Sequence, residues 1–262
     1  MPVHRKHISV HIEKTAGTSL RDALNSMYGP DKVFTYSPTR NIFRRSSEML
    51  FPWTYPFIQR LRKRFGDSDF FLAFLRGYRN VVSCRQKVYT FEELPIDFEV
   101  LHGHFCADFF DSKIHNPIRT VVLREPLARM VSHFNHLKER KNELDWRINI
   151  PYSPQMTFED FALSDEMKNY QAQAFGKYTF EDFDIVGTAE NSNYFMYRLQ
   201  ILVKGKAKKY EVKRFNESPP NYQKKYPMSE EFVRKFKIFH ARDYALWEKA
   251  RENEFRYEES KR

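Results

Sequence analysis

Short apolar runs alternate along this chain with stretches whose apolar positions repeat at helical spacing. An apolar run bounded by polar residues predicts a buried strand, and a repeat of three to four residues predicts an amphipathic helix. Four runs predict strands, at residues 7–12, 97–105, 118–125 and 183–190. Helical spacing and capping residues predict helices over 19–28, 126 to about 141, 157–175, 191 to about 203, and 229–256.

Strands that alternate with helices predict a mostly parallel central sheet with helices on both faces, which is an α/β fold. We expect one domain over residues 1–262. Residues 30–95 fit the alternation least, because basic clusters are mixed there with Phe, Trp and Tyr. They are predicted to be a mobile or helical insertion on the acceptor side of a cleft, or an ordinary amphipathic surface helix.

Composition adds a preference for anionic partners. The chain has 262 residues and a net charge of +10, from 44 basic and 34 acidic residues. This charge fits a nucleotide, a glycan, a nucleic acid or a membrane surface, and also an ordinary basic protein. The two cysteines, Cys84 and Cys106, show no disulfide or metal spacing. With no long apolar segment and no signal-peptide core at the start, we expect a cytoplasmic protein without a transmembrane segment.

The most informative segment joins the first predicted strand to the first predicted helix. A helix N-terminus offers backbone N–H groups and a partial positive charge, so a tight loop before it can cradle an anion. Gly17 allows close approach to a ligand, Lys14 adds a charge, and the hydroxyl groups can donate to phosphate oxygens. The alternative is a plain turn capped by Thr or Ser. The candidate binding residues are Lys14, Thr15, Ala16, Gly17, Thr18 and Ser19.

A second candidate anion site follows the third predicted strand. Arg124 lies at the strand end, and Ser132 lies on the next helix. A guanidinium binds phosphate in a bidentate manner, and a nearby hydroxyl group can complete the site. The alternative is an ordinary strand–helix unit with a surface arginine. Arg129 fits either a site or a pair with a helix carboxylate.

The segment LHGHF supplies a candidate base. His102 and His104 lie on one side of a strand, because side chains alternate with a period of two. Histidine can accept a proton near neutral pH, although the pair can also be two hydrogen-bonded structural residues. His133 and His136 are expected to face solvent or to cap their helix. No third metal ligand accompanies the pair, so we expect no metal.

The residues HIEKTAGTSL resemble the 5′-phosphosulfate loop of sulfotransferases, and most resemble the carbohydrate branch of the heparan sulfate 2-O type, usually HIPKTAGTSL. LREPLARMVSHF is similar to the family's 3′-phosphate motif, LRDPxxRxxSxY. Glu13 replaces Pro, Glu125 replaces Asp and Phe134 replaces Tyr. Weaker similarity continues through NYQAQAFG (169–176), FDIVGTAE (183–190), RFNES (214–218) and ARDYALWEKA (241–250).

This resemblance implies a P-loop-like three-layer fold and transfer of a sulfuryl group from 3′-phosphoadenylyl sulfate (PAPS) to a hydroxyl group. Adenosine 3′,5′-bisphosphate is then the product. The loop from Lys14 to Ser19 would hold the 5′ side of the donor, while Arg124 and Ser132 would hold its 3′-phosphate. His104 would be the base with His102 as its partner, and Lys14 would stabilise the leaving phosphate. The acceptor would be a carbohydrate or a small metabolite, with no nucleic acid and no metal involved.

Two other functions stay open from the sequence. One is a nucleotide-dependent kinase with an atypical phosphate loop, which magnesium dependence would reveal. The other is a non-catalytic basic module that binds glycan or nucleic acid and forms no product. A run of cations suggests this second alternative, although Glu211 within it and the loop context fit a solvated edge and no nucleic-acid motif accompanies it. The run consists of Lys204, Lys206, Lys208, Lys209, Lys213 and Arg214.

Overall fold

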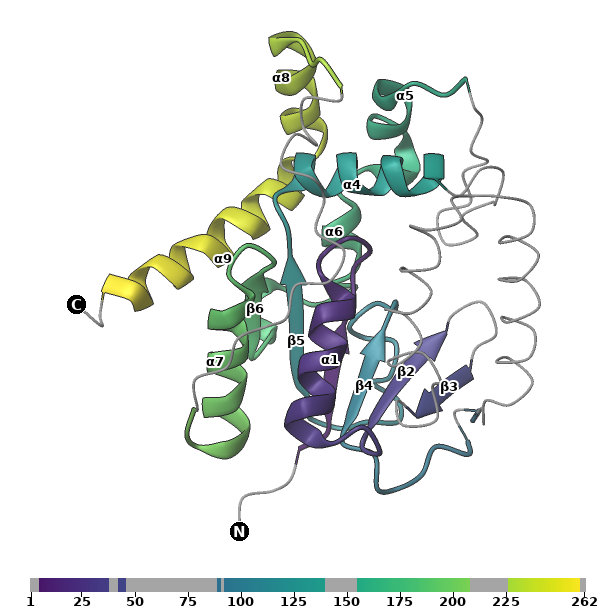
Figure 1. The fold of residues 1–262 in the computed structure, drawn as a ribbon, viewed down its shortest axis with the longest axis vertical. Helices are drawn as coiled ribbons and strands as arrows, with labels where there is room; N and C mark the ends of the chain where they lie inside the picture. The colour runs from purple at the N-terminus through teal and green to yellow at the C-terminus, as the bar shows by residue number, and fades with distance from the viewer. Residues whose placement is uncertain are drawn as a thin grey trace, which may run out of the picture.

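A six-stranded sheet forms the centre of the computed structural model, which describes residues 5–37, 42–45, 89–90, 92–139, 155–207 and 226–259 (Figure 1). The spatial order is β3-β2-β4-β1-β5-β6, with every neighbouring pair parallel except β2 and β3. The strands are β1 (His7–Val10), β2 (Val33–Ser37), β3 (Ile42–Arg45), β4 (Val100–Gly103), β5 (Ile118–Leu123) and β6 (Ile185–Thr188).

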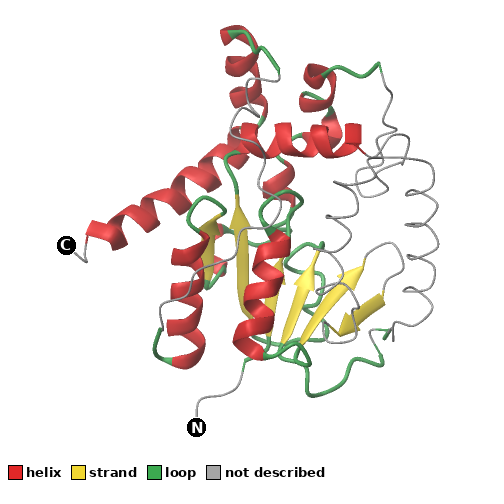
Figure 2. Cartoon of the chain, viewed as in Figure 1, coloured by secondary structure: helices red, strands yellow, loops and turns green. Residues whose placement is uncertain are grey.

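Helices surround this sheet (Figure 2). Two of them, α1 and α7, pack on one face, while Ala250 of α9 packs with Val10 and Val121 on the other. The predicted α/β class, with a mostly parallel sheet flanked by helices, is confirmed. The α-helices are α1 (Gly17–Tyr28), α4 (Pro126–Glu139), α5 (Phe158–Ala162), α6 (Tyr170–Gln173), α7 (Ser192–Lys204), α8 (Glu230–Phe239) and α9 (Ala241–Glu259), with short 3-10 turns η2 (Asp165–Met167) and η3 (Phe180–Asp182).

The central strand β1 has an apolar side and a polar side, although all of it is buried. Ile8 and Val10 join the apolar cluster on the face that α9 covers. On the opposite side, Nε2 of His7 lies 2.8 Å from Oγ1 of Thr120, and the hydroxyl of Tyr28 on α1 lies 3.1 Å from Nδ1 of His7. Burial lowers the pKa of His7 to about 3, so this ring is neutral and satisfied by hydrogen bonds. A buried polar layer therefore lies beneath α1.

Part of the segment predicted as an insertion belongs to the sheet. Residues 33–37 form β2 and 42–45 form β3, where the sequence predicted no strand. Val33 and Phe34 are fully buried, and β2 pairs with β4 along its length. Sheet pairing and burial thus outweigh the basic and aromatic surroundings of these residues. Residues 46–88 lie outside the described residues.

Two predicted helices are interrupted. Residues 157–175 form α5, η2 and α6 instead of one helix, and Asn169 before α6 has a left-handed φ of 49°. The 229–256 segment divides into α8 and α9 at His240. The buried His240 ring lies 2.8 Å from the Ala162 carbonyl and accepts from the Asn169 N–H at 3.2 Å. The contacts of the His240 ring therefore connect the two places where the predicted helices are interrupted.

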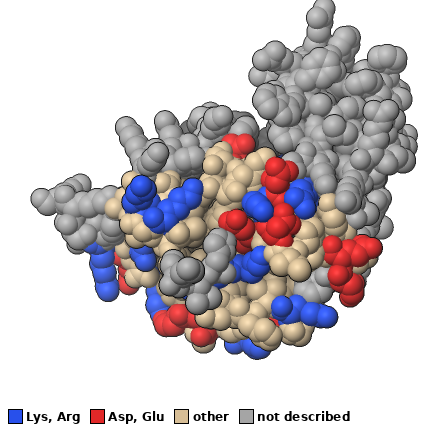
Figure 3. All heavy atoms as spheres, turned by 90° about the horizontal axis from the view of Figure 1, so that it is seen from below, with Lys and Arg blue, Asp and Glu red and all other residues tan. Residues whose placement is uncertain are grey.

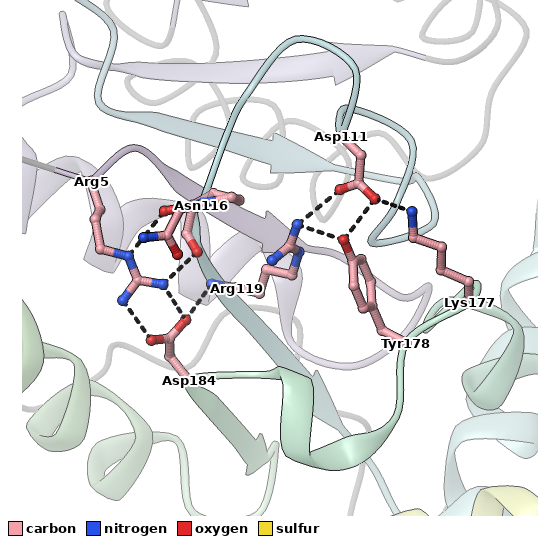
Figure 4. Close-up of polar contacts among 8 residues, drawn as sticks. Arg5, Asp111, Asn116, Arg119, Lys177, Tyr178 and Asp184 are labelled. Carbon is pink, nitrogen blue, oxygen red and sulfur yellow. Dashed lines mark hydrogen bonds and ion pairs between the residues drawn. The ribbon is translucent and has the colours of Figure 1, made fainter.

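A polar network fixes the amino ends of β5 and β6 (Figure 4). Asp184, just before β6, accepts from Nη1 of Arg5 and from the Arg119 backbone N–H, both at 2.9 Å. The Arg119 side chain donates to Asp111 and to the Tyr178 hydroxyl, each at 2.8 Å. These bonds connect the N-terminal segment, β5 and the loop before β6.

The face seen from below, at the amino ends of the parallel strands, carries mixed charge. Basic and acidic side chains lie next to one another there (Figure 3). The basic run that begins at Lys204 is only partly described. Lys204 donates through Nζ to the Met27 carbonyl at 2.8 Å, and residues 208–214 lie outside the described residues.

Glu254 on α9 ties that helix to the carboxyl end of β6. Its carboxyl oxygens accept from the Thr188 N–H at 2.8 Å and from the Thr188 hydroxyl at 3.0 Å. Burial raises the pKa of Glu254 from 4.5 to about 7, against the opposing effect of these hydrogen bonds. Between those two pH values the folded chain holds a proton that the unfolded chain has released, so stability falls as pH rises through this window.

We expect the free energy of unfolding to drop by on the order of 1–3 kcal/mol between pH 4.5 and 8 through this group. Glu254→Gln should remove that part of the pH dependence, because the amide can keep both contacts without a charge. Urea unfolding at several pH values measures it. Glu252→Gln, an exposed position on the same helix, is the control. An unchanged pH slope in Glu254→Gln would contradict the prediction.

Candidate active site

The carboxyl ends of three neighbouring parallel strands bring the predicted residues to one edge of the sheet. The loop from His11 follows β1, His104 follows β4 and Arg124 follows β5. Because β1 lies between β4 and β5, its loop is flanked by the other two strand ends. This is the edge where open α/β sheets bind ligands.

The backbone of the loop is strained in a way that suits an anion. Lys14 has a φ of 70° and Ala16 a φ of 65°, both in the left-handed region that side chains disfavour. Ala16 is the N-cap of α1, and no side chain caps this helix start. The first N–H groups of a helix have no acceptor within the helix, and successive N–H groups in such turns form anion-binding concavities. The loop therefore presents backbone donors at the N-terminus of α1.

The loop side chains divide into two groups. The Thr15 hydroxyl donates to the Ile12 carbonyl at 2.9 Å, so its hydrogen closes the turn instead of serving the ligand as expected. Thr15 and Ser19 are buried, whereas Thr18 is exposed and Lys14 is half-buried. Lys14 and Thr18 are thus the loop residues named here that are not buried.

Gly17 is required by a close contact with His11. A Cβ atom at Gly17 would overlap the His11 imidazole ring, well inside van der Waals distance. The first residue of α1 therefore lies directly against a histidine at the end of β1. This contact joins the loop to the histidines described below.

Arg124 reaches the same loop from β5. Its Nη1 donates to the Lys14 carbonyl at 3.1 Å. The side-chain amide of Gln171 holds the Arg124 backbone by accepting from its N–H and donating to its carbonyl, both at 2.9 Å. The backbone of Arg124 is therefore held in place by Gln171, and its guanidinium lies beside the loop. Ser132, the second residue predicted to bind phosphate, is buried on α4.

Arg129 is fully buried behind the loop. Its Nη1 lies 3.5 Å from the Glu13 carbonyl and 3.4 Å from Nδ1 of His133, and the guanidinium stacks 4.7 Å from the centre of the Tyr170 ring. Burial lowers the pKa of Arg129, with Asp243 as the largest opposing influence. The expectation that His133 faces solvent is wrong, because Arg129, Phe161 and Tyr170 enclose it.

Three histidine rings lie next to one another at the ends of β1 and β4. The His11 ring lies 5.0 Å from that of His102 and 4.2 Å from that of His104, between centroids. His102 is buried, and its Nδ1 lies 3.0 Å from the Ser9 hydroxyl. Burial, assisted by the charges of Arg21 and His104, lowers the pKa of His102 to about 3. His102 therefore belongs to the buried polar layer and is neutral.

His104 has a different environment. Its Nδ1 lies 2.8 Å from the His11 carbonyl and 3.1 Å from Oε1 of Glu13. Sequence reasoning missed His11 and Glu13 as members of this cluster. Two signals could have found them: His11 follows a strand with the parity of His7 and Ser9, and Glu13 replaces a proline of the resembled loop.

Comparisons with known proteins give likenesses in structure but none in sequence family. No protein-family model matches the chain, and no curated protein matches it. A solved structure of a sulfotransferase from Alicyclobacillus acidocaldarius matches with a TM-score of 0.42 and 13% identity, over 94% of this chain and 95% of that one. At this similarity, the case for a function rests on the residues of the site.

The described residues contain no group of three or more His, Cys, Asp or Glu side chains arranged to hold a metal ion. No helix among them combines the length and apolar character needed to cross a membrane.

Proposed function

We propose that this protein is a sulfotransferase that moves a sulfuryl group from PAPS to a hydroxyl group, with a carbohydrate as the acceptor class. The observation that carries the proposal is the edge shared by Arg124, His104 and the strained loop before α1. The cationic side chains of Lys14 and Arg124, together with the N-terminus of α1, suit a nucleotide that carries phosphates at both the 3′ and 5′ positions of the ribose. A histidine near them suits proton removal from an acceptor.

The proposed reaction is an in-line displacement at sulfur. The acceptor oxygen forms a bond to sulfur and gives its proton to His104, while the bond from sulfur to the oxygen of the 5′-phosphate breaks. The electrons of that bond stay on the phosphate, so the products are a sulfate ester and adenosine 3′,5′-bisphosphate. Lys14 and the backbone donors of the loop stabilise the charge that develops on the leaving oxygen.

The buried environment of His102 supports His104 as the base. A ring whose pKa is about 3 is a weak base, and Ser9 already occupies its Nδ1. The carbohydrate acceptor rests on the resemblance of HIEKTAGTSL and LHGHF to the heparan sulfate 2-O-type branch. The cytoplasmic location stays a prediction from the cysteine content.

Lys14→Ala provides the test of donor binding. We expect adenosine 3′,5′-bisphosphate to bind more weakly by about 1.5–3 kcal/mol, the scale of a charge-assisted hydrogen bond. Isothermal titration calorimetry in magnesium-free buffer measures this loss, and sulfate transfer from labelled PAPS across sugar and small-alcohol acceptors measures the activity.

Lys206→Ala is the matched control, because Lys206 is an exposed lysine of the basic run just after the C-terminal end of α7. An equal loss in both variants would indicate non-specific attraction to a basic surface and favour a polyanion-binding module. Nucleotide binding that requires magnesium would favour the kinase alternative.

A further inference from the structure

Glu13 makes two polar contacts that concern the proposed base. Its Oε1 lies 3.1 Å from Nδ1 of His104, and its Oε2 accepts from the Tyr170 hydroxyl at 2.7 Å. Three elements meet here, because Glu13 lies in the loop after β1, His104 follows β4 and Tyr170 begins α6. A proline at position 13, as in the resembled loop, could make neither contact.

The contacts of His104 determine which ring nitrogen carries the proton. The His11 carbonyl is 2.8 Å from Nδ1 and can only accept, so Nδ1 must donate. The Glu13 carboxylate accepts at the same nitrogen. In the neutral ring the lone pair is therefore on Nε2, which is the nitrogen able to take a proton.

Exposure separates the two partners. The His104 side chain is 23% exposed, whereas that of Glu13 is 7% exposed. The imidazole can meet an acceptor at the surface, while its carboxylate partner is shielded from water. Shielding strengthens the attraction between the carboxylate and a protonated ring, because charges interact more strongly away from water.

We propose that Glu13 is the positioning residue of the base: its carboxylate holds the His104 ring with Nδ1 protonated and stabilises the imidazolium formed when Nε2 takes the acceptor proton. The inference rests on the proposed sulfotransferase function. Glu13 does not touch the reacting atoms and acts only through His104. The arrangement follows the general logic of a carboxylate that orients a catalytic histidine.

Other charged or titratable groups lie near this pair. Apart from Asp243 they are neutral or positive near neutral pH, and Asp243 accepts from the Gln171 and Ala172 N–H groups, so within this set Glu13 is the carboxylate in contact with His104. They are Lys14 in the loop, His11 at the end of β1, His102 on β4, Arg21 on α1, Arg124 after β5, Arg129 on α4, Tyr170 on α6 and Asp243 on α9.

Glu13→Gln tests the proposal, since the amide keeps the size and an acceptor but loses the charge. We expect turnover to fall by about 10-fold or more, up to the 10²–10⁴-fold contributed by a general base, with unchanged affinity for adenosine 3′,5′-bisphosphate. The acidic limb of kcat/KM should move to lower pH by about one unit or more, because the protonated ring loses its counter-charge. Glu13→Asp, which keeps the charge, should restore part of both.

A second readout needs no activity. Long-range ¹H–¹⁵N NMR of the His104 ring should show Nδ1 protonated in the wild-type protein, and its titration should move to lower pH in Glu13→Gln. The His104 signals are assigned by their loss in His104→Gln. Glu166→Gln, an exposed carboxylate on η2, is the control for charge alone and should leave every readout unchanged.

The outcomes separate this inference from the function on which it rests. A wild-type protein without sulfate transfer would overturn the proposed function. The NMR experiment would still decide whether Glu13 keeps Nδ1 of His104 protonated and raises the pH at which the ring titrates. An unshifted titration in Glu13→Gln, or a ring protonated at Nε2 in the wild-type protein, would overturn the inference even with full activity. Loss of folding and donor affinity without a shifted titration would reduce Glu13 to a structural residue and overturn it too.

Discussion

His104→Ala should lower turnover by about 10²–10⁴-fold, the usual contribution of a positioned general base, while adenosine 3′,5′-bisphosphate binds with nearly unchanged affinity. The donor loop and Arg124 do not depend on the imidazole for their mutual contact, because Arg124 reaches the Lys14 carbonyl directly. Sulfate transfer at saturating donor measures the rate, and calorimetry measures the affinity.

His115→Ala is the control for this experiment. His115 is exposed and precedes the amino end of β5, whereas the site lies at the carboxyl ends of the strands. A near-native rate in His104→Ala would move the base to another group. A joint loss of rate, donor affinity and melting temperature would indicate that the ring supports the structure around His11 instead of taking a proton.

The second large effect is expected at the 3′-phosphate. Arg124→Ala and Ser132→Ala should each weaken binding of adenosine 3′,5′-bisphosphate far more than binding of adenosine 5′-phosphate. For Arg124 the difference should reach about 10- to 100-fold, because a charge-assisted bidentate contact is lost. Calorimetry with both nucleotides measures this difference directly.

Arg124 also donates to the loop, so its removal can disturb the 5′ side as well. Arg124→Lys keeps a charge at the site and should lose less than Arg124→Ala. Arg234→Ala, an exposed arginine on α8, controls for overall charge. Equal losses for the two nucleotides would contradict the assignment of Arg124 and Ser132 to the 3′-phosphate.

The strands that sequence reasoning found share one property. All four are apolar runs: 7–12, 97–105 and 118–125 become the inner strands β1, β4 and β5, and 183–190 becomes the edge strand β6, although each observed strand is shorter than predicted. β2 and β3 were not predicted from the sequence, because their sequences, VFTYS and IFRR, lie among cations and aromatic residues. Their strand character comes from pairing with β4 and with each other, which no local pattern reveals.

The interruptions of the two predicted helices could not be predicted for a similar reason. The break at His240 depends on a ring that contacts Ala162 and Asn169, which are 78 and 71 residues away in the chain. Apolar spacing continues through both breaks, so periodicity alone predicts uninterrupted helices. The deciding interactions are tertiary hydrogen bonds of a buried side chain.

The candidate site was partly predictable. Lys14, Gly17, Arg124 and His104 stood out because each follows a predicted strand, and parallel strand ends share an edge. The structure brings the Arg124 guanidinium to the Lys14 carbonyl, as that argument expects. The difference between His102 and His104 was not predictable, because it depends on burial beneath α1 and on the carboxylate of Glu13.

The contact between Gly17 and the His11 ring has a consequence for how such a protein can diversify. The stretch from His11 to Gly17 contains the backbone proposed to bind the donor and both groups that hold His104. In the proposed reaction, donor binding and proton removal therefore depend on one short stretch of chain, and a single insertion or deletion within it would damage both. Segments that contain neither this stretch nor His104, Arg124 and Ser132 can change without disturbing the proposed chemistry, so a change of acceptor would need only changes around a constant reaction centre.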